Sequence, residues 1–573
     1  MELHANKPDP HLGVRRFARI RRGERLMARA LFCLLAAVYL LVATGLPDHN
    51  DSETEFQTTS ALGRGGTFAL GGTTESDALV AFRRALPDDP RIPVKLSPDG
   101  ERAYSWFGTG QALVGVPFYW VGKGLGLLAP GVEQGFAART VEGVARSEYH
   151  AHLLVGLRNP LLGAATAWLV VLCALRLGLT RRTAFLAGLT YGLCTFALPQ
   201  ARSTLSDVQA TACLFGAFYL TLTAREHLER ARRPALRHLA GAGMLLGLAL
   251  LTRVATAPAI AVLGVAMVGV LLVGHRQSPV CGEAPPAKVL LRDLAAFGLP
   301  ALAGLGLFLW WNHARFGAPL ESGYGDVVDG SFFAFHPGLG LLLLLLAPGK
   351  GLAFLAPGLL LAPLGFRWAE GGAGRFFAWV ALAVTVAVFG MVAPTQTWHG
   401  AWTFGPRYVL PALPFLWLGT AVALERLSGK GRVLAWALMA VGAVGAVGGT
   451  LTDHMTHQDL ALQAARAEWP DTPGGDDALF GRIQVEPRYA APWAHWRILR
   501  HRVAGLGETF SSADLFGTEV DVPLTPSPTL RPGFTHLAWV DHRSLGGATW
   551  PVLLVAGGLV LLALRLLARA RLH

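Results

Sequence analysis

Long stretches without charged side chains are the feature that most constrains this chain. Several uncharged runs are about 17–22 residues long, and a helix of that length spans the roughly 30 Å of hydrocarbon in a bilayer. Only 15% of the 573 residues are charged, whereas soluble proteins carry about a quarter. The sequence therefore predicts an all-α polytopic membrane protein.

The arginines between the apolar runs indicate how the chain is oriented. Short arginine-rich loops favour the cytoplasmic side of a membrane, and the amino-terminal segment is rich in arginine. With that segment inside, arginine-rich loops and longer polar loops alternate along the chain. This pattern predicts about twelve spans in the bacterial cytoplasmic (inner) membrane, with both termini in the cytoplasm.

The same map divides the chain into four parts. Residues 1–29 form a cytoplasmic basic tail, 30–449 the transmembrane domain, 450–548 a small outer polar domain, and 549–573 the last helix with a second basic tail. The transmembrane domain includes a long first outer loop, residues 47–150. In this loop we expect an amphipathic helix and an apolar helix that lies in the plane of the membrane interface.

Composition also excludes one class of partner. The net charge of +12 is compatible with nucleic-acid binding, but the basic residues fall in short clusters between apolar runs, where they set topology. No nucleic-acid partner is expected. The five cysteines all lie outside long polar segments, so disulfides in an exported domain are not expected either.

Acidic residues gather just after the first predicted span, in "DHNDSETEF". Asp48, Asp51 and Glu53 would lie at the outer membrane surface, where a carboxylate can accept a proton from an attacking hydroxyl. The alternative is helix capping, in which Asp51 or Ser52 caps the helix and Glu55 completes a capping box. A divalent cation is also left open, because these acids can bind one although their spacing is not diagnostic of a metal site.

Arg407 is the outer cation that is hardest to explain by topology alone. It follows Gly405 and Pro406 in "TWHGAWTFGPRYVLPALP", so it is expected at a helix amino terminus among aromatic side chains. An arginine beside free backbone N–H groups makes an anion site that suits phosphate. Snorkelling to lipid headgroups and a structural ion pair are the alternatives.

Other outer cations are weaker candidates for the same role. Arg202 lies near Asp207 at the mouth of two predicted helices, where such a pair is either functional or structural. Arg253 follows a short apolar helix and is expected to reach the outer interface. Lys95 could meet a lipid phosphate, although such residues are more often solvated.

In combination, these motifs resemble the GT-C superfamily of integral membrane glycosyltransferases, which use polyprenyl-phosphate-linked sugars. Protein mannosyltransferases and the aminoarabinose transferases of lipid A belong to this superfamily. The resemblance covers roughly residues 30–450. It is carried by "DHNDSETEF", "YSWFGTGQALVGVPFYWVG", "GLALLTRVATA", "WNHARFGAPLESGYG", "APGKGLAFLAPGLLLAPLG" and "WHGAWTFGPRYVLPALP". The usual Asp-Glu pair of the family stands here as Asp51-Ser52-Glu53, and Trp106 stands where relatives often carry a charge.

The resemblance implies a fold, a reaction and a set of site residues. The reaction is inverting transfer of a sugar to an envelope acceptor that the sequence does not identify, with a carboxylate of the first outer loop as general base, Asp51 before Asp48 or Glu53. The residues implied for the donor phosphate are Arg407, Arg202, Lys95, Arg253 and Lys350. The residues implied for the substrate pocket are Tyr104, Trp106, Trp398, His399, Trp402 and Tyr408.

The lipid part of such a donor requires an apolar groove that opens to the bilayer. The segment "LLLLLLAPGKGLAFLAPG" could form its wall, since Pro348, Gly349 and Lys350 predict a broken, re-entrant segment instead of one straight helix. Because the chain has no nucleotide-binding motif, the donor is expected to arrive through the membrane.

Two other classes of protein remain as alternatives. A transporter or flippase of a lipid-linked or polar solute would carry its charged residues near the middle of the membrane; here they gather at one face, and the chain shows no inverted repeat. A non-enzymatic partner in envelope assembly would use residues 450–548 for binding, and replacement of the acids would then have no effect.

Overall fold

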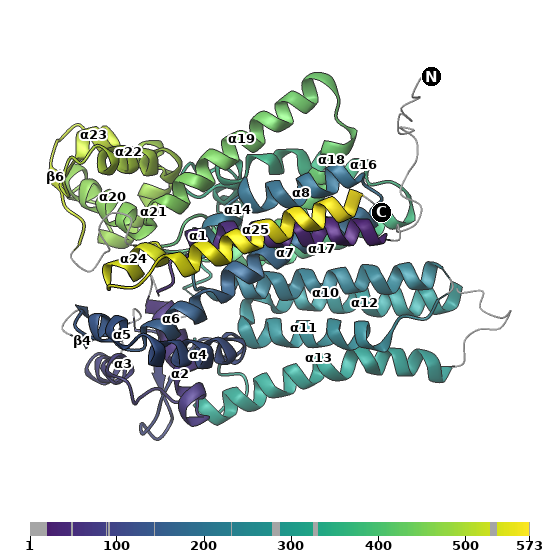
Figure 1. Cartoon of the computed structure of the whole chain (residues 1–573), viewed down its shortest axis with the longest axis horizontal. Helices are drawn as coiled ribbons and strands as arrows, with labels where there is room; N and C mark the ends of the chain where they lie inside the picture. The colour runs from purple at the N-terminus through teal and green to yellow at the C-terminus, as the bar shows by residue number, and fades with distance from the viewer. Residues whose placement is uncertain are drawn as a thin grey trace.

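The computed structural model describes residues 20–46, 50–87, 89, 92–141, 144–230, 232–277, 287–324, 331–527 and 536–571. Most of the described chain is helical, as Figure 1 shows. Asp48 and Cys281 lie outside the described residues.

The helices follow one another with short connections. Those up to residue 229 are α1 (Arg22–Val42), α2 (Asn50–Gly65), α3 (Thr74–Ala85), α4 (Gly110–Leu128), α5 (Pro130–Ala137), α6 (Tyr149–Gly156), α7 (Arg158–Arg176), α8 (Arg181–Leu193), α9 (Ala197–Arg202) and α10 (Ser206–Glu229). The middle of the chain, in which η marks a 3-10 helix, contains α11 (Leu236–Thr252), η1 (Val254–Thr256), α12 (Ala257–Gln277), α13 (Ala287–Phe316), α14 (Pro337–Leu346), α15 (Leu352–Leu355), η2 (Pro357–Leu361), α16 (Ala362–Trp368), α17 (Gly371–Val392), η3 (Arg407–Ala412), α18 (Leu413–Arg426) and α19 (Gly429–Leu451). The last part contains α20 (His454–Glu468), α21 (Gly475–Val485), η4 (Pro487–Tyr489), α22 (Ala491–Val503), α23 (Ser512–Phe516), α24 (Ala538–Ser544) and α25 (Trp550–Arg571).

Three short antiparallel pairs of strands interrupt the helical fold in the described part of the chain, and the sequence did not predict them. They pair β1 (Val94–Leu96) with β2 (Ala103–Ser105), β3 (Thr140–Val141) with β4 (Val144–Ala145), and β5 (Phe510–Ser511) with β6 (Pro523–Leu524). In the first hairpin Lys95 lies opposite Tyr104. The turn between the two strands has Gly100 at φ +73°, a conformation that glycine adopts without steric cost.

Eight helical segments of the described chain are long and apolar enough to cross a membrane. They are α1, α6 with α7, η1 with α12, α13, α17, η3 with α18, α19 and α25. Helices α4 and α5 would add a ninth span if they are counted as one, but they meet at an angle of 101°. The chain is thus a multi-pass membrane protein, and the count of about twelve spans stays a prediction.

Small residues allow the helices to pack closely. Gly247 of α11 and Gly304 of α13 face one another, and a Cβ built on Gly304 would lie 2.4 Å from the Gly247 Cα atom. Gly243 meets the Phe297 backbone in the same crossing. Such contacts are typical of membrane helices, whose association depends on close backbone approach.

The predicted break in the chain near residue 348 is present. Helix α14 ends at Leu346, and the chain continues through the short helices α15 and η2 into α16. Proline cannot donate a backbone hydrogen bond and clashes with the preceding turn, which explains why no helix runs through Pro348.

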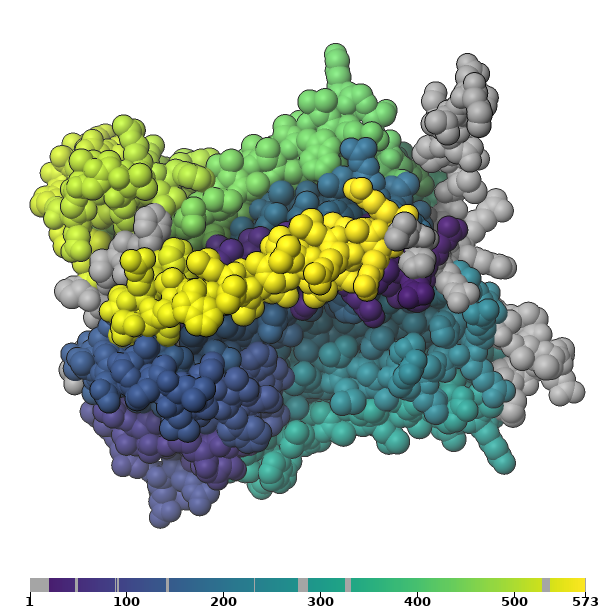
Figure 2. Space-filling view, in the orientation of Figure 1, coloured from purple at the N-terminus to yellow at the C-terminus, as the bar shows by residue number. Residues whose placement is uncertain are grey.

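The polar parts of the chain gather at one end of the helical bundle. Figure 1 shows α2–α6 and α20–α24 at the end opposite to the first residues of α1 and the last residues of α25, and Figure 2 shows both groups on the surface there. Helices α20–α23 enclose a separate apolar cluster that includes Leu460, Phe480, Tyr489, Ile498 and Phe516. The polar end of the bundle, formed by α2–α6 and α20–α24, is therefore opposite to the end at which α1 begins and α25 ends (Figure 1).

Candidate active site

A cavity of about 500 Å³ lies at this polar end of the bundle. Its lining comes from segments that are far apart in the sequence: α2, the loop after β2, η1, the end of α13, α17 and the start of η3. Five charged side chains line it, namely Asp51, Glu55, Arg253, Arg315 and Arg407. The cavity thus brings carboxyl groups and guanidinium groups together.

Asp51 and Arg407 meet directly in this cavity. The Nη2 atom of Arg407 donates to the Oδ2 atom of Asp51 at 3.2 Å, across 356 residues of sequence. The same guanidinium donates to the Tyr408 hydroxyl at 3.2 Å and lies 4.9 Å from the centre of the Tyr408 ring. The acid after the first span and the arginine of the Gly-Pro-Arg turn therefore share one site.

The loop before Arg407 holds that arginine in place. Gly400 and Gly405 have φ values of +78° and +74°, which favour glycine. A Cβ on Gly400 would lie 2.8 Å from the Arg407 backbone nitrogen, so the loop can wrap around Arg407 only with glycine there. After Pro406 the chain enters the 3-10 helix η3, which continues as α18.

Glu55 is a second carboxyl in the cavity, one helical turn after Asp51. It is buried, and its Oε2 atom has no hydrogen-bond partner among the described residues. Burial raises the pKa of Glu55 to about 8; the negative charges of Asp51 and Asp207 add to this shift, whereas Arg158 and Arg253 oppose it. A carboxyl with such a pKa can accept or donate a proton near neutral pH.

Glu55 does not act as a capping residue. Helix α2 begins at Asn50, and the Ser52 hydroxyl has no hydrogen-bond partner in the described part of the chain. A capping box between Ser52 and Glu55 is therefore absent there, and that form of the capping alternative was wrong, whereas capping by Asp51 stays open.

A second ion pair borders the cavity beside the first. The Nη1 atom of Arg253 lies 3.2 Å from the Oδ1 atom of Asp207, whose side chain is fully buried. The Arg253 guanidinium also lies 4.7 Å from the centre of the Tyr408 ring. Arg253 and Arg407 therefore both contact Tyr408, so two arginine–aspartate pairs lie side by side at the cavity.

The first outer loop closes the cavity on another side. Trp106 stacks on Tyr324 with ring centres 5.9 Å apart, and both line the cavity. Arg315 fastens this loop to the end of α13, because its Nη1 atom donates to the carbonyl oxygens of Ser105 at 2.6 Å and Phe107 at 3.1 Å.

Part of the cavity wall is apolar. It is formed by Phe308, Phe332, Phe333, Val388, Met391 and Val392. These side chains come from α13, α17 and the segment before α14, all of which are membrane-spanning or next to a span. The broken segment around Pro348 does not line the cavity, so the lipid groove that it was expected to form is not found there.

Glu53 lies outside this cavity, unlike Asp51. Its carboxylate pairs with Arg146 at 3.2 Å and with His152 at 3.3 Å, and it accepts from the Gln57 amide at 2.7 Å. Burial alone would raise the pKa of Glu53, but these partners hold it well below its usual value. Glu53 therefore joins α2 to the segment before α6.

Several of the predicted phosphate ligands also lie elsewhere. Lys95 lies 3.7 Å from Glu321. Arg202 donates to the Thr450 carbonyl oxygen and lines a second cavity of about 30 Å³. The buried ammonium of Lys350 donates to the carbonyl oxygens of Ala401 and Thr403.

The predicted pocket residues divide in the same way. Trp106 and Tyr408 line the main cavity, whereas Trp402 lines the small second one. Tyr104 packs on Trp311 and Phe316, Trp398 packs on Phe335, and His399 packs on Phe480. Trp402 also stacks on Phe480. Burial and the nearby Lys350 and Arg407 lower the pKa of His399 to about 3, so its imidazole is neutral.

Sequence reasoning did not single out Glu55, Arg315 and Tyr324, which line the cavity. Glu55 could have been found, because residues four apart lie on one face of a helix and an amphipathic helix was predicted there. Arg315 and Tyr324 lie within "WNHARFGAPLESGYG", a quoted motif in which no single residue stood out.

Comparisons with known proteins give structural neighbours. Neither protein-family models nor curated protein sequences gave a match. The chain is similar to the crystal structure of ArnT from Cupriavidus metallidurans bound to undecaprenyl phosphate, with 14% identity over 94% of this chain and 76% of that chain and a TM-score of 0.41. It is also similar to an oligosaccharyltransferase from Archaeoglobus fulgidus tethered with an acceptor peptide, with 13% identity, 79% and 58% coverage and a TM-score of 0.39.

The chain is likewise similar to the archaeal oligosaccharyltransferase AglB from Archaeoglobus fulgidus in complex with an inhibitory peptide and a dolichol-phosphate, with 13% identity over 76% of this chain and 59% of that chain and a TM-score of 0.35. Because identity and TM-score are low, the function has to be inferred from the residues of the site.

Proposed function

We propose that this protein transfers a sugar from a polyprenyl-phosphate donor to an envelope acceptor at the outer face of the cytoplasmic membrane. The observation that carries the proposal is the cavity in which Asp51 and Glu55 face Arg407 and Arg253. Its opposite charges suit a reaction in which a hydroxyl or amine loses a proton while a phosphate leaves. Its apolar wall suits a donor with a lipid tail.

The two arginines would bind the phosphate of the donor. A guanidinium binds phosphate oxygens through charge-assisted hydrogen bonds, and Arg407 and Arg253 are held on the same Tyr408 ring. Without a donor, Arg407 pairs with Asp51. A phosphate that replaces Asp51 at Arg407 would release the Asp51 carboxylate at the moment when the donor is in place.

The released carboxylate would then act as general base. The acceptor O–H or N–H loses its proton to Asp51, and the acceptor atom forms a bond to the anomeric carbon of the sugar. The bond between that carbon and the phosphate oxygen breaks, and its electron pair leaves with the polyprenyl phosphate. The arginines stabilise the negative charge that develops on the leaving phosphate, and attack from the opposite side inverts the anomeric centre.

Glu55 would assist as the neighbouring proton carrier. With a pKa of about 8, it is largely protonated at pH 7, so it can hold a proton while Asp51 stays ionised. Two carboxyl groups whose environments separate their pKa values often divide acid and base roles between them.

The apolar wall would hold the first isoprene units of the donor. Phe308, Phe332 and Phe333 lie on the side of the cavity formed by α13 and the segment before α14, and Val388 and Met391 belong to α17. Helices α13 and α17 are both candidate spans, so a lipid tail on this wall would continue into the bilayer.

The proposal is tested with the full-length protein in lipid nanodiscs. Binding of undecaprenyl phosphate is measured by native mass spectrometry, and transfer is measured from a panel of radiolabelled undecaprenyl-phosphate sugars to membranes that supply the acceptor. Arg407→Ala should weaken undecaprenyl phosphate binding at least tenfold, because a hydrogen bond to a charged group contributes about 1.5–3 kcal/mol. Asp51→Asn should retain binding and abolish transfer.

Lys95→Ala is the matched control, since it removes an outer cation whose side chain lies outside the cavity. It should leave binding and transfer unchanged. Full transfer activity in both Asp51→Asn and Arg407→Ala would overturn the proposed site. No transfer by the unmodified protein with any donor of the panel would favour a non-enzymatic role in envelope assembly.

A further inference from the structure

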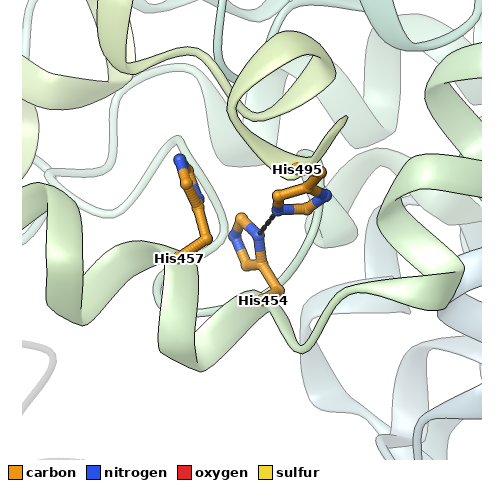
Figure 3. Close-up of side chains that lie close together, drawn as sticks. All are labelled: His454, His457 and His495. Carbon is orange, nitrogen blue, oxygen red and sulfur yellow. Dashed lines mark hydrogen bonds between the residues drawn. The ribbon is translucent and has the colours of Figure 1, made fainter. Parts of the chain in front are cut away.

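Three buried histidines meet inside the small outer domain, away from the cavity described above. His454 and His457 lie one turn apart on α20, and His495 lies on α22 (Figure 3). Each offers a ring nitrogen, and these three nitrogens lie within 4.8 Å of one another. Three imidazoles in this arrangement are the ligand set of several protein zinc sites.

One of the distances already matches a metal site. The Nδ1 atom of His454 and the Nε2 atom of His495 are 3.2 Å apart. Two nitrogens that each bind a tetrahedral zinc ion at about 2.0–2.1 Å are separated by roughly 3.3 Å. The pair therefore needs almost no movement to bind one ion, whereas the His457 nitrogen, which lies within 4.8 Å of the other two, has to come closer.

The hydrogen bond of His457 prepares its other nitrogen for metal binding. Its Nε2 atom lies 2.9 Å from the Tyr489 carbonyl oxygen, which can only accept, so Nε2 carries the hydrogen. The Nδ1 atom then has the free electron pair, which now accepts a hydrogen bond from the Gln458 amide at 3.1 Å. Metal-binding histidines are commonly oriented in this way by a backbone carbonyl.

Burial keeps the three imidazoles neutral, as metal ligands must be. It lowers the pKa of His457 to about 4 and lowers the pKa values of His454 and His495 well below the usual range. The cations Lys350 and Arg202 contribute to these shifts. They also oppose a bound cation, so we expect a weaker site than one that includes carboxylates.

We propose that His454, His457 and His495 bind one transition-metal cation, with Zn²⁺ as the first candidate and a water molecule as the fourth ligand. Imidazole ligands suit zinc, copper and nickel better than calcium or magnesium. The ion would join α20 to α22 and would stabilise the outer domain.

The site would also affect the loop that carries Arg407. The Phe404 ring lies 5.7 Å from the His454 ring and 5.4 Å from the His495 ring. Phe404 belongs to the same loop as Gly405 and Arg407, so a rigid histidine cluster would support that loop from behind. This inference does not depend on the proposed transfer activity.

The test uses the full-length protein without a polyhistidine tag, treated with a chelator and then incubated with ZnCl₂. Elemental analysis should find about one zinc per chain, and the melting temperature should rise by several degrees. Co²⁺ added in place of Zn²⁺ should give the intense visible absorption of a tetrahedral site. This readout needs no variant.

His457→Gln and His495→Gln should lose the metal and the melting-temperature shift. His501→Gln is the matched control, because His501 lies on α22 but outside the cluster. Less than about 0.1 zinc per chain in the unmodified protein, or equal zinc content in His457→Gln and the unmodified chain, would overturn the proposal.

Discussion

The three acids of α2 show how helix geometry assigns different roles to neighbouring residues. Asp51 and Glu55 are one turn apart and face the cavity, whereas Glu53 faces Arg146 and His152 on the other side of the helix. Each residue turns a helix by 100°, so residues two apart point in nearly opposite directions. The choice among the acids of the first loop therefore favours Asp51 over Glu53.

The pKa of Glu55 predicts how stability depends on pH. Its folded-state pKa of about 8 lies above the value of about 4.3 expected for an unfolded chain, so the folded protein binds the extra proton. Stability is then lost as pH rises from about 4.3 towards 8, by up to about 1.4 kcal/mol per pH unit. Glu55→Gln removes this loss. The melting temperature of the variant minus that of the unmodified protein should therefore increase as pH rises from 5 to 8.5.

Glu53→Gln is the control for that measurement. The pKa of Glu53 is lowered by its partners, so its charged form stabilises the fold at neutral pH, and this stabilisation is lost only under acid conditions, as pH falls through the lowered pKa. The variant should melt below the unmodified protein at pH 7. A Glu55→Gln melting temperature that does not change relative to the unmodified protein across pH 5–8.5 would contradict the raised pKa.

The proposed role of Glu55 in proton transfer predicts that the transfer rate also depends on pH. If Glu55 carries the transferred proton, its ionisation near pH 8 should appear as a limb in the dependence of the transfer rate on pH. Glu55→Gln should remove that limb and should leave undecaprenyl phosphate binding within about twofold. Rates between pH 6 and pH 9.5 measure this, and an unchanged profile in the variant would exclude Glu55 from proton transfer.

At the scale of the elements, the crossing of α11 and α13 depends on the absence of side chains. A Cβ on Gly304 would lie 2.4 Å from the Gly247 Cα atom, whereas one on Gly306 meets nothing within 4 Å. Overpacking of this kind typically costs about 1–3 kcal/mol, and a backbone contact cannot relax as a flexible side chain does.

Gly304→Val should therefore lower the melting temperature by several degrees, and Gly306→Val on the same helix should leave it nearly unchanged. Thermal unfolding of the two variants in the same detergent provides the measurement. Equal melting temperatures for both variants would show that α11 and α13 do not pack as described.

At the scale of the whole molecule, we expect the polar end and the terminal end to face opposite sides of the membrane. Asp471 lies between α20 and α21, Lys430 lies in the first turn of α19, and both are exposed. Arginine-rich segments remain inside, so Asp471→Cys should react with an impermeant maleimide on intact spheroplasts, and Lys430→Cys only after permeabilisation. The reverse labelling pattern would place the cavity on the cytoplasmic side.

The apolar runs by themselves indicated a polytopic helical protein, because the length and polarity of a segment decide whether it can cross a bilayer. A common site for the first-loop acids and Arg407 could also be predicted, since the acids and the turn at Gly405 and Pro406 lie on the same predicted side. The three short strand pairs could not, because strands of two or three residues carry too little pattern.

The tertiary structure alone decided which outer cations reach the cavity. Three more cations were expected in the cavity because they lie near the membrane surface on the predicted outer side. In the structure, Arg202 and Lys350 donate to backbone carbonyl oxygens, and Lys95 pairs with Glu321. Sequence determines on which side of the membrane a residue lies, because that depends on the count and polarity of the spans. Side-chain direction depends on how distant helices pack, so the contacts of Arg315, Glu55 and the three histidines became visible only in the folded chain.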